Sequence, residues 1–169
     1  MQLSGHASSI AQPISVLFVC MGNICRSPLA ELALTLEATA AGLPIIVDSA
    51  GTGDWHVGLA PDRRARAVAA RFGHSIDHYR ARQISTQDFA DFDHVIALDG
   101  QILQDLRAIQ PSGSRAVLSL LFDQIHGREG EDVFDPYYRD EAAFLETWDD
   151  VSAGARALVA MFSAQTVSG

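Results

Sequence analysis

Cysteine, positive charge and long apolar runs are all scarce in this chain of 169 residues. The only two cysteines are Cys20 and Cys25, which do not make a disulfide framework, and no set of cysteines and histidines has the spacing of zinc ligands. This usage favours a reducing compartment, so we expect a cytoplasmic protein. Because no set of metal ligands is present in the sequence, we expect no metal, and we expect no other cofactor. No apolar run approaches the ~20 residues of a membrane span.

Acidic residues outnumber basic ones by 21 to 12, which gives a net charge of −9. Such a balance disfavours binding to nucleic acid or to an anionic membrane. Residues 1–13 lack the pattern of a signal peptide, and we expect a short disordered extension there. The remaining length and the 48% apolar content fit one domain, which we place at residues 14–163.

Short apolar runs alternate with helical patterns along the chain. Strands are expected at residues 16–19, 45–47, 95–98 and 116–121. Helices are expected at residues 28–41, 61–72, 101–109 and 141–162. This order favours an α/β fold, with a single-domain, open, mostly parallel four-stranded sheet and helices on both faces. Ligands of such sheets bind outside the carboxyl ends of the strands, where Cys20, Asp99 and Asp135 can converge.

The segment from Cys20 to Pro28 combines a thiol with an anion-binding loop. It joins a buried strand to a helix that is expected to begin at Ser27 and Pro28. Backbone N–H groups and the positive end of the helix dipole would then point to the same place. Arg26 carries a planar fork that can hold two phosphate oxygens. These groups and the Ser27 hydroxyl favour the thiolate of Cys20, which is the nucleophilic form.

The other residues of the loop fit the same chemistry. Gly22 has no side chain to block an anion, and Asn23 tolerates a left-handed backbone while its amide can lock the loop. The alternative is a free core cysteine beside a surface arginine. That alternative leaves Asn23, Ser27 and Pro28 unexplained.

The nine residues Cys-Met-Gly-Asn-Ile-Cys-Arg-Ser-Pro, from Cys20 to Pro28, resemble the signature loop of the low-molecular-weight protein tyrosine phosphatases. The resemblance covers about residues 14–163. It implies hydrolysis of phosphotyrosine and aryl phosphates through a phosphocysteine on Cys20, with phosphate held by Arg26 and the loop N–H groups. The residues that would bind phosphate or support the loop are Met21, Gly22, Asn23, Ile24, Cys25 and Ser27.

A phenolate leaving group needs a proton donor, and the loop itself holds no acid. Asp135 is the candidate, in the segment Asp-Pro-Tyr-Tyr, because the family carries its general acid in a matching Asp-Pro motif late in the chain. The alternative for Asp135 is a plain Asp-Pro turn. Asp99 matches the family only partly, and capping the helix that follows is an equally open role for it.

Three aromatic residues are candidates for the walls of the substrate pocket. Trp55 lies in a glycine-flanked loop and is either such a wall or an anchor for the loop. Tyr137 and Tyr138 would form the opposite wall or lie on the surface, and both are candidate targets of a tyrosine kinase. Cys25 either forms a reversible disulfide with Cys20 after oxidation or only fills space.

The remaining charged residues are expected to have ordinary roles. No histidine has a partner that suggests catalysis. A solvated helix face is expected for four arginines, Arg63, Arg64, Arg66 and Arg71.

Three other functions compete on this fold or this loop. A thioredoxin-coupled arsenate reductase needs further cysteines, and the chain has none after Cys25. Protein arginine phosphatases carry threonine where this chain has Ile24, whose apolar side chain favours a phenyl ring. A non-catalytic phosphotyrosine-binding module would be expected to lose Cys20 or Asp135. We therefore expect phosphotyrosine proteins as partners, and a monomer or weak dimer.

Overall fold

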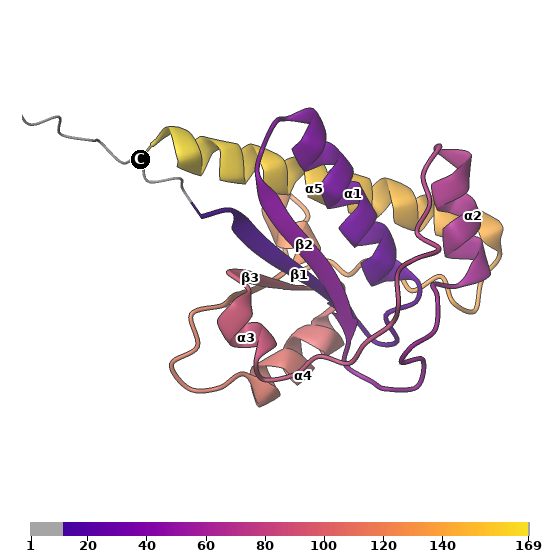
Figure 1. The fold of residues 1–169 in the computed structure, drawn as a ribbon, viewed down its shortest axis with the longest axis horizontal. Coiled ribbons are helices and arrows are strands. Elements are labelled where there is room, and N and C mark those ends of the chain that lie inside the picture. The colour runs from indigo at the N-terminus through magenta and orange to yellow at the C-terminus, as the bar shows by residue number, and fades with distance from the viewer. Residues whose placement is uncertain (1–11, 169) are drawn as a thin grey trace, which may run out of the picture.

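Four parallel strands form one sheet in the order β2-β1-β3-β4 (Figure 1). The structure is a computed structural model, and it describes residues 12–168. The strands are β1 (Ile14–Cys20), β2 (Ile45–Gly51), β3 (His94–Ala97) and β4 (Val117–Leu120). The predicted open α/β sheet is therefore confirmed, and every strand pairing in it is parallel.

Helices cover both faces of this sheet (Figure 1). One face carries α1 (Arg26–Ala40), α2 (Arg63–Arg71) and α5 (Glu141–Val167). The other face carries α3 (Asp88–Asp91) and α4 (Gly100–Ile109). A single 3-10 turn, η1 (Leu121–Gln124), follows β4. No helix within residues 12–168 has the length and apolar character needed to cross a bilayer.

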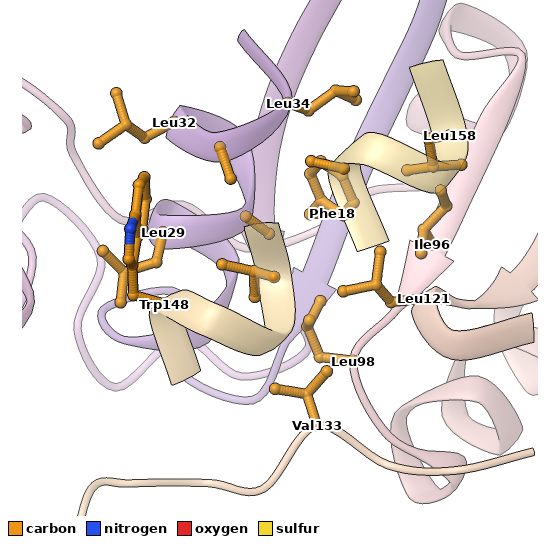
Figure 2. Packing of buried hydrophobic residues seen from close by; sticks show 14 of the residues in the cluster. Phe18, Leu29, Leu32, Leu34, Ile96, Leu98, Leu121, Val133, Trp148 and Leu158 are labelled. Carbon is orange, nitrogen blue, oxygen red and sulfur yellow. The ribbon is translucent and has the colours of Figure 1, made fainter. Parts of the chain in front are cut away.

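The continuous apolar run of β1 is explained by helices on both sides. Val16 and Phe18 face α1 and α5, whereas Leu17 and Val19 face α3 and α4, and all four are fully buried. Successive side chains of a strand point to opposite faces, so a strand in a covered sheet must be apolar at every position. Figure 2 shows Phe18 among the side chains of the α1 and α5 layer.

Several element boundaries differ from the predictions. Helix α1 begins at Arg26, so Pro28 is its third residue and not its first. The missing N–H of Pro28 still costs nothing, since none of the first four N–H groups of a helix has an intrahelical partner. Strand β2 continues four residues beyond its predicted end to Gly51. Helix α5 continues past Phe162, its last core residue, to Val167, because no glycine or proline interrupts that segment.

The other boundaries agree within one or two residues, with β4 ending at Leu120 where η1 begins. Residues 1–11 of the predicted N-terminal extension lie outside the described residues.

Candidate active site

The predicted site residues lie at the carboxyl edge of the sheet. Cys20 is the last residue of β1, Asp99 follows β3, and the segment with Asp135 leads into α5. A cavity of about 460 Å³ opens at this edge. Its lining consists of Cys20, Met21, Gly22, Ile24, Cys25, Arg26, Trp55, His56, Asp135, Tyr137 and Tyr138. Residues more than a hundred positions apart are thus brought around one space.

Cys20 forms the floor of the cavity, and its side chain is 3% exposed. The Sγ atom lies 2.9 Å from Oγ of Ser27. That hydroxyl accepts a hydrogen bond from Nδ2 of Asn23 at 2.8 Å, so its own proton remains free to be donated to the sulfur. The arrangement supplies the hydrogen bond that a thiolate needs.

Asn23 locks the loop, as its sequence context predicted. Its φ of +57° lies in the left-handed region, which asparagine adopts more readily than other residues with a Cβ. Besides Ser27, its amide donates to Oγ of Ser49 at 2.9 Å and accepts from the backbone N–H of Arg82 at 3.0 Å. Both ends of the side chain are therefore used, and the loop is tied to β2 and to the segment before α3.

Several carbonyl groups of the loop accept backbone hydrogen bonds, whereas its N–H groups donate none to backbone carbonyls within residues 12–168. The carbonyls of Cys20, Met21 and Ile24 accept hydrogen bonds from backbone N–H groups of residues 52, 53 and 62. In the part of the chain that the structure describes, no backbone N–H from Met21 to Cys25 donates to a backbone carbonyl. With the N-terminus of α1 directly behind them, these groups form a site suited to an anion.

Arg26 is almost fully buried beside this loop, with 3% of its side chain exposed. Its Nη1 donates to Oδ2 of Asp99 at 2.7 Å and to the carbonyl of Val133 at 2.9 Å, and its Nη2 lies 3.6 Å from Oδ2 of Asp135. Burial acts to lower the pKa of Arg26, but the charge of Cys20 and the two carboxylates outweigh it and raise the pKa. The guanidinium therefore stays charged and is held in one orientation.

Asp99 caps a helix, which its sequence context left open, and it also binds Arg26, which the sequence did not predict. One carboxylate oxygen accepts from the N–H of Ile102 at 2.8 Å and caps α4, while the other binds Arg26. The cap thus fixes the carboxylate that orients the guanidinium.

Asp135 lies at the mouth of the cavity, with its side chain 43% exposed. Its Oδ1 accepts from the N–H of Tyr137 at 3.1 Å. The segment is held by Arg64, which donates to the carbonyls of Tyr137 and Arg139 at 2.9 and 2.7 Å and pairs with Asp62 at 3.0 Å. The prediction of a solvated face was therefore wrong for Arg64, because its partners come from a distant segment that local spacing does not reveal.

The three predicted aromatic residues all line the mouth of the cavity. Trp55 is 67% exposed, so it is not a buried anchor for its loop. Its ring lies over Gly53, where a Cβ would come within 1.7 Å of the ring, which explains the need for glycine. Tyr137 and Tyr138 meet edge to face at 4.9 Å between ring centroids, and Tyr138 is 92% exposed.

His56 also lines the cavity, and the sequence did not single it out. The half-buried ring lies against the loop, since a Cβ on Gly22 would be 2.9 Å from its Cδ2. The sequence feature that could have indicated a place for His56 in the cavity is its position next to Trp55 in the same glycine-flanked loop.

Cys25 lies in the lining of the cavity but is 4% exposed. Burial, and then the charges of Asp62, Cys20 and Asp135, raise the pKa of its thiol well above the ordinary value. Cys25 is therefore a protonated thiol at neutral pH, and both cysteines are free.

Comparisons with known proteins agree on one family. The model of the low molecular weight phosphotyrosine protein phosphatases matches residues 15–168. A Schizosaccharomyces pombe low molecular weight phosphotyrosine protein phosphatase is 42% identical over 134 residues, which is 78% of this chain and 85% of that protein.

Solved structures show the same likeness. The crystal structure of YfkJ from Bacillus subtilis has a TM-score of 0.85 and 38% identity, covering 92% of this chain and 98% of that one. The Drosophila arginine phosphatase DARP has a TM-score of 0.80 and 33% identity, covering 87% and 96%.

Proposed function

The chain belongs to the low-molecular-weight phosphotyrosine protein phosphatase family, and from that premise we propose that it hydrolyses phosphotyrosine in proteins through a phosphocysteine on Cys20. The observation that carries this proposal is the convergence of the Cys20 thiol, the Arg26 guanidinium and the Asp135 carboxyl on one cavity with an aromatic mouth. Each of the three supplies a part that the reaction needs.

In the first step the Cys20 thiolate attacks phosphorus. An S–P bond forms as the P–O bond to the phenol breaks, and Asp135 gives its proton to the departing oxygen. Arg26 and the free N–H groups of the loop bind the three equatorial oxygens, where negative charge is spread in the transition state. The Ser27 hydroxyl stabilises the thiolate before the attack.

In the second step water attacks the phosphocysteine. Asp135, now a carboxylate, takes a proton from the water, the S–P bond breaks, and inorganic phosphate leaves. The Ser27 hydroxyl then donates again to the sulfur as it regains its negative charge. Asp135 is exposed enough to admit water, and its segment is fixed by Arg64.

A substrate with a phenyl ring is supported over phosphoarginine by the lining of the cavity. The side chain of Ile24 lines it, and Trp55, Tyr137 and Tyr138 surround its mouth. An apolar slot fits a flat ring better than a charged guanidinium, which would lose its hydration there. Because DARP is named as an arginine phosphatase, phosphoarginine must nevertheless be included as a substrate in the test.

Cys25 is proposed to protect the nucleophile. Peroxide would oxidise the Cys20 thiolate to a sulfenic acid, and the Cys25 thiol would then condense with it to a disulfide and release water. The two side chains line the same cavity, and the thiol form of Cys25 leaves Cys20 as the reactive partner.

The direct test is hydrolysis of p-nitrophenyl phosphate by the wild type and Cys20→Ser, followed by phosphotyrosine and phosphoarginine peptides. We expect turnover by the wild type, none by the variant, and preference for phosphotyrosine. An inactive wild type would instead favour a phosphate-binding module. An equal rate for Cys20→Ser would remove this residue from the reaction.

A further inference from the structure

Exposed large apolar side chains lie in the segments that form the mouth of the cavity. They form what is called here the apolar rim, which consists of Met21, Trp55, Val57, Leu59, Phe134, Tyr137 and Tyr138. Large exposed apolar patches on a single chain mark interaction sites more often than chance. We therefore expect a binding partner to cover the apolar rim and displace water from it.

The apolar rim is continuous with the proposed phosphate site. Met21, Trp55, Tyr137 and Tyr138 line the cavity itself. Tyr138 also lines a second hollow of about 600 Å³, which extends over Phe134 toward the start of α5. A peptide whose phosphotyrosine enters the cavity therefore meets apolar side chains beyond the cavity as well.

The loop that carries Val57 and Leu59 is fixed in place. The N–H groups of Thr52 and Gly53 bond to carbonyls of the phosphate loop at 2.9 and 3.0 Å, and Leu59 closes a turn onto His56 at 2.9 Å. The carbonyl of Leu59 in turn accepts from Ala81 at 2.9 Å. Because the surface is preformed, little ordering entropy opposes binding to it.

Charge around the mouth disfavours an acidic partner. The chain contains no lysine, Arg26 and Arg64 are paired with carboxylates, and Arg139 shares the second hollow with two more acidic residues. The paired carboxylates are Asp99 and Asp135 for Arg26 and Asp62 for Arg64. Asp140 and Glu146 line the second hollow together with Arg139, so this hollow has a net negative charge. The guanidinium of Arg139 itself lies over the ring of Phe134, 5.1 Å from its centroid. Acidic residues next to the phosphotyrosine would thus meet apolar surface and further negative charge.

We propose that the apolar rim binds the residues that flank the phosphotyrosine, and that it selects substrate proteins in which these residues are apolar or aromatic and not acidic. The inference rests on the proposed phosphatase function and adds its substrate class. Apolar flanking side chains gain by leaving water, whereas carboxylates lose hydration and meet further negative charge.

The test uses two phosphotyrosine peptides of equal length, one flanked by Leu, Val and Phe and the other by Asp and Glu. Every rate is divided by the rate with p-nitrophenyl phosphate from the same preparation. The wild type should show a kcat/KM about tenfold or more higher for the apolar peptide, which corresponds to burial of one or two side chains. Equal values, or preference for the acidic peptide, would overturn the proposal.

Leu59→Arg tests the surface directly. It should raise kcat/KM for the acidic peptide and lower it for the apolar one. The matched control is Val117→Arg, since Val117 is 53% exposed against 56% for Leu59 but begins β4 at the other end of the sheet. The control should keep the wild-type ratio, and an equal shift in both variants would contradict the proposal.

Two other outcomes are distinguishable. Absence of turnover of p-nitrophenyl phosphate by the wild type would overturn the phosphatase function and this inference with it. Turnover without preference would overturn the inference alone.

Sedimentation of the wild type and Leu59→Arg tests whether a second copy of the chain covers the apolar rim. A stable dimer that Leu59→Arg dissociates would also overturn the inference.

Discussion

Glu31→Gln should change how the stability of the protein depends on pH. Glu31 lies on α1 and is 8% exposed. Burial, and then the charge of Asp48, raise the pKa of its carboxyl from the ordinary 4.5 to about 8, although Arg82 acts to lower it. Burial, and then Glu31 and Asp48, also raise the pKa of Tyr79 to about 12, which places these three groups in one cluster.

The sign and size follow from proton linkage. Because the pKa is higher in the folded state, the folded protein binds the proton more tightly, and stability is lost as pH rises from about 4.5 to about 8. At about 1.4 kcal/mol per pKa unit, the loss is about 5 kcal/mol. Glutamine carries no titrating proton, so Glu31→Gln should escape this loss and become the more stable protein at high pH.

The assay is urea unfolding of both proteins at several pH values between 4 and 9. The free energy of unfolding of the wild type, minus that of Glu31→Gln, should fall by several kcal/mol across this range and level off above pH 8. Glu37→Gln is the control, because Glu37 is half-buried on the same helix and lies 3.9 Å from Arg156. A difference for Glu31→Gln that does not vary with pH would refute the reasoning.

Further predictions concern the site itself. Asp135→Ala should lower kcat for phenyl phosphates by about 10²–10⁴-fold, far more than Cys25→Ala, and comparable losses would remove Asp135 from the acid role. Asn23→Ala removes three hydrogen bonds and leaves alanine in a left-handed conformation. The kcat/KM and the melting temperature should therefore both fall. An unchanged kcat/KM would show that the loop does not depend on this amide. Peroxide should inactivate reversibly, and Cys25→Ser should fail to recover under thiol, whereas equal recovery would contradict a protective disulfide. EDTA should leave the rate unchanged, and a large loss would contradict a reaction driven by Arg26 and backbone groups.

The phosphate loop was predictable because its parts are consecutive in sequence. Cys20, Asn23, Arg26 and Ser27 fall within eight residues, and their chemistry can be inferred from residue type and spacing alone. The left-handed conformation of Asn23 and the contact between the Cys20 sulfur and the Ser27 hydroxyl were both expected from that segment.

The contacts that sequence spacing missed all join distant segments. Arg64 reads as one of several exposed arginines on a helix, yet it donates to two carbonyls more than seventy residues away. His56 has no partner nearby in sequence and acquires its position only because the loop after β2 lies over Gly22.

Strand β2 shows the same limit for backbone structure. Its last residues, from Asp48 to Gly51, are polar or small and do not favour a strand by propensity. They pair with β1 in register, with Leu17 opposite Asp48 and Cys20 opposite Gly51. A Cβ on Gly51 would lie 2.7 Å from the carbonyl oxygen of Met21, so this glycine permits the close approach of the phosphate loop.

The most direct measurement is to trap the covalent intermediate. Asp135→Ala is mixed with p-nitrophenyl phosphate, quenched with acid within the first turnover, and digested for mass spectrometry. The account predicts one added phosphoryl group on the peptide that contains Cys20, and none in Cys20→Ser. Turnover without phosphoryl transfer to this peptide, or a phosphoryl group on another residue, would contradict it.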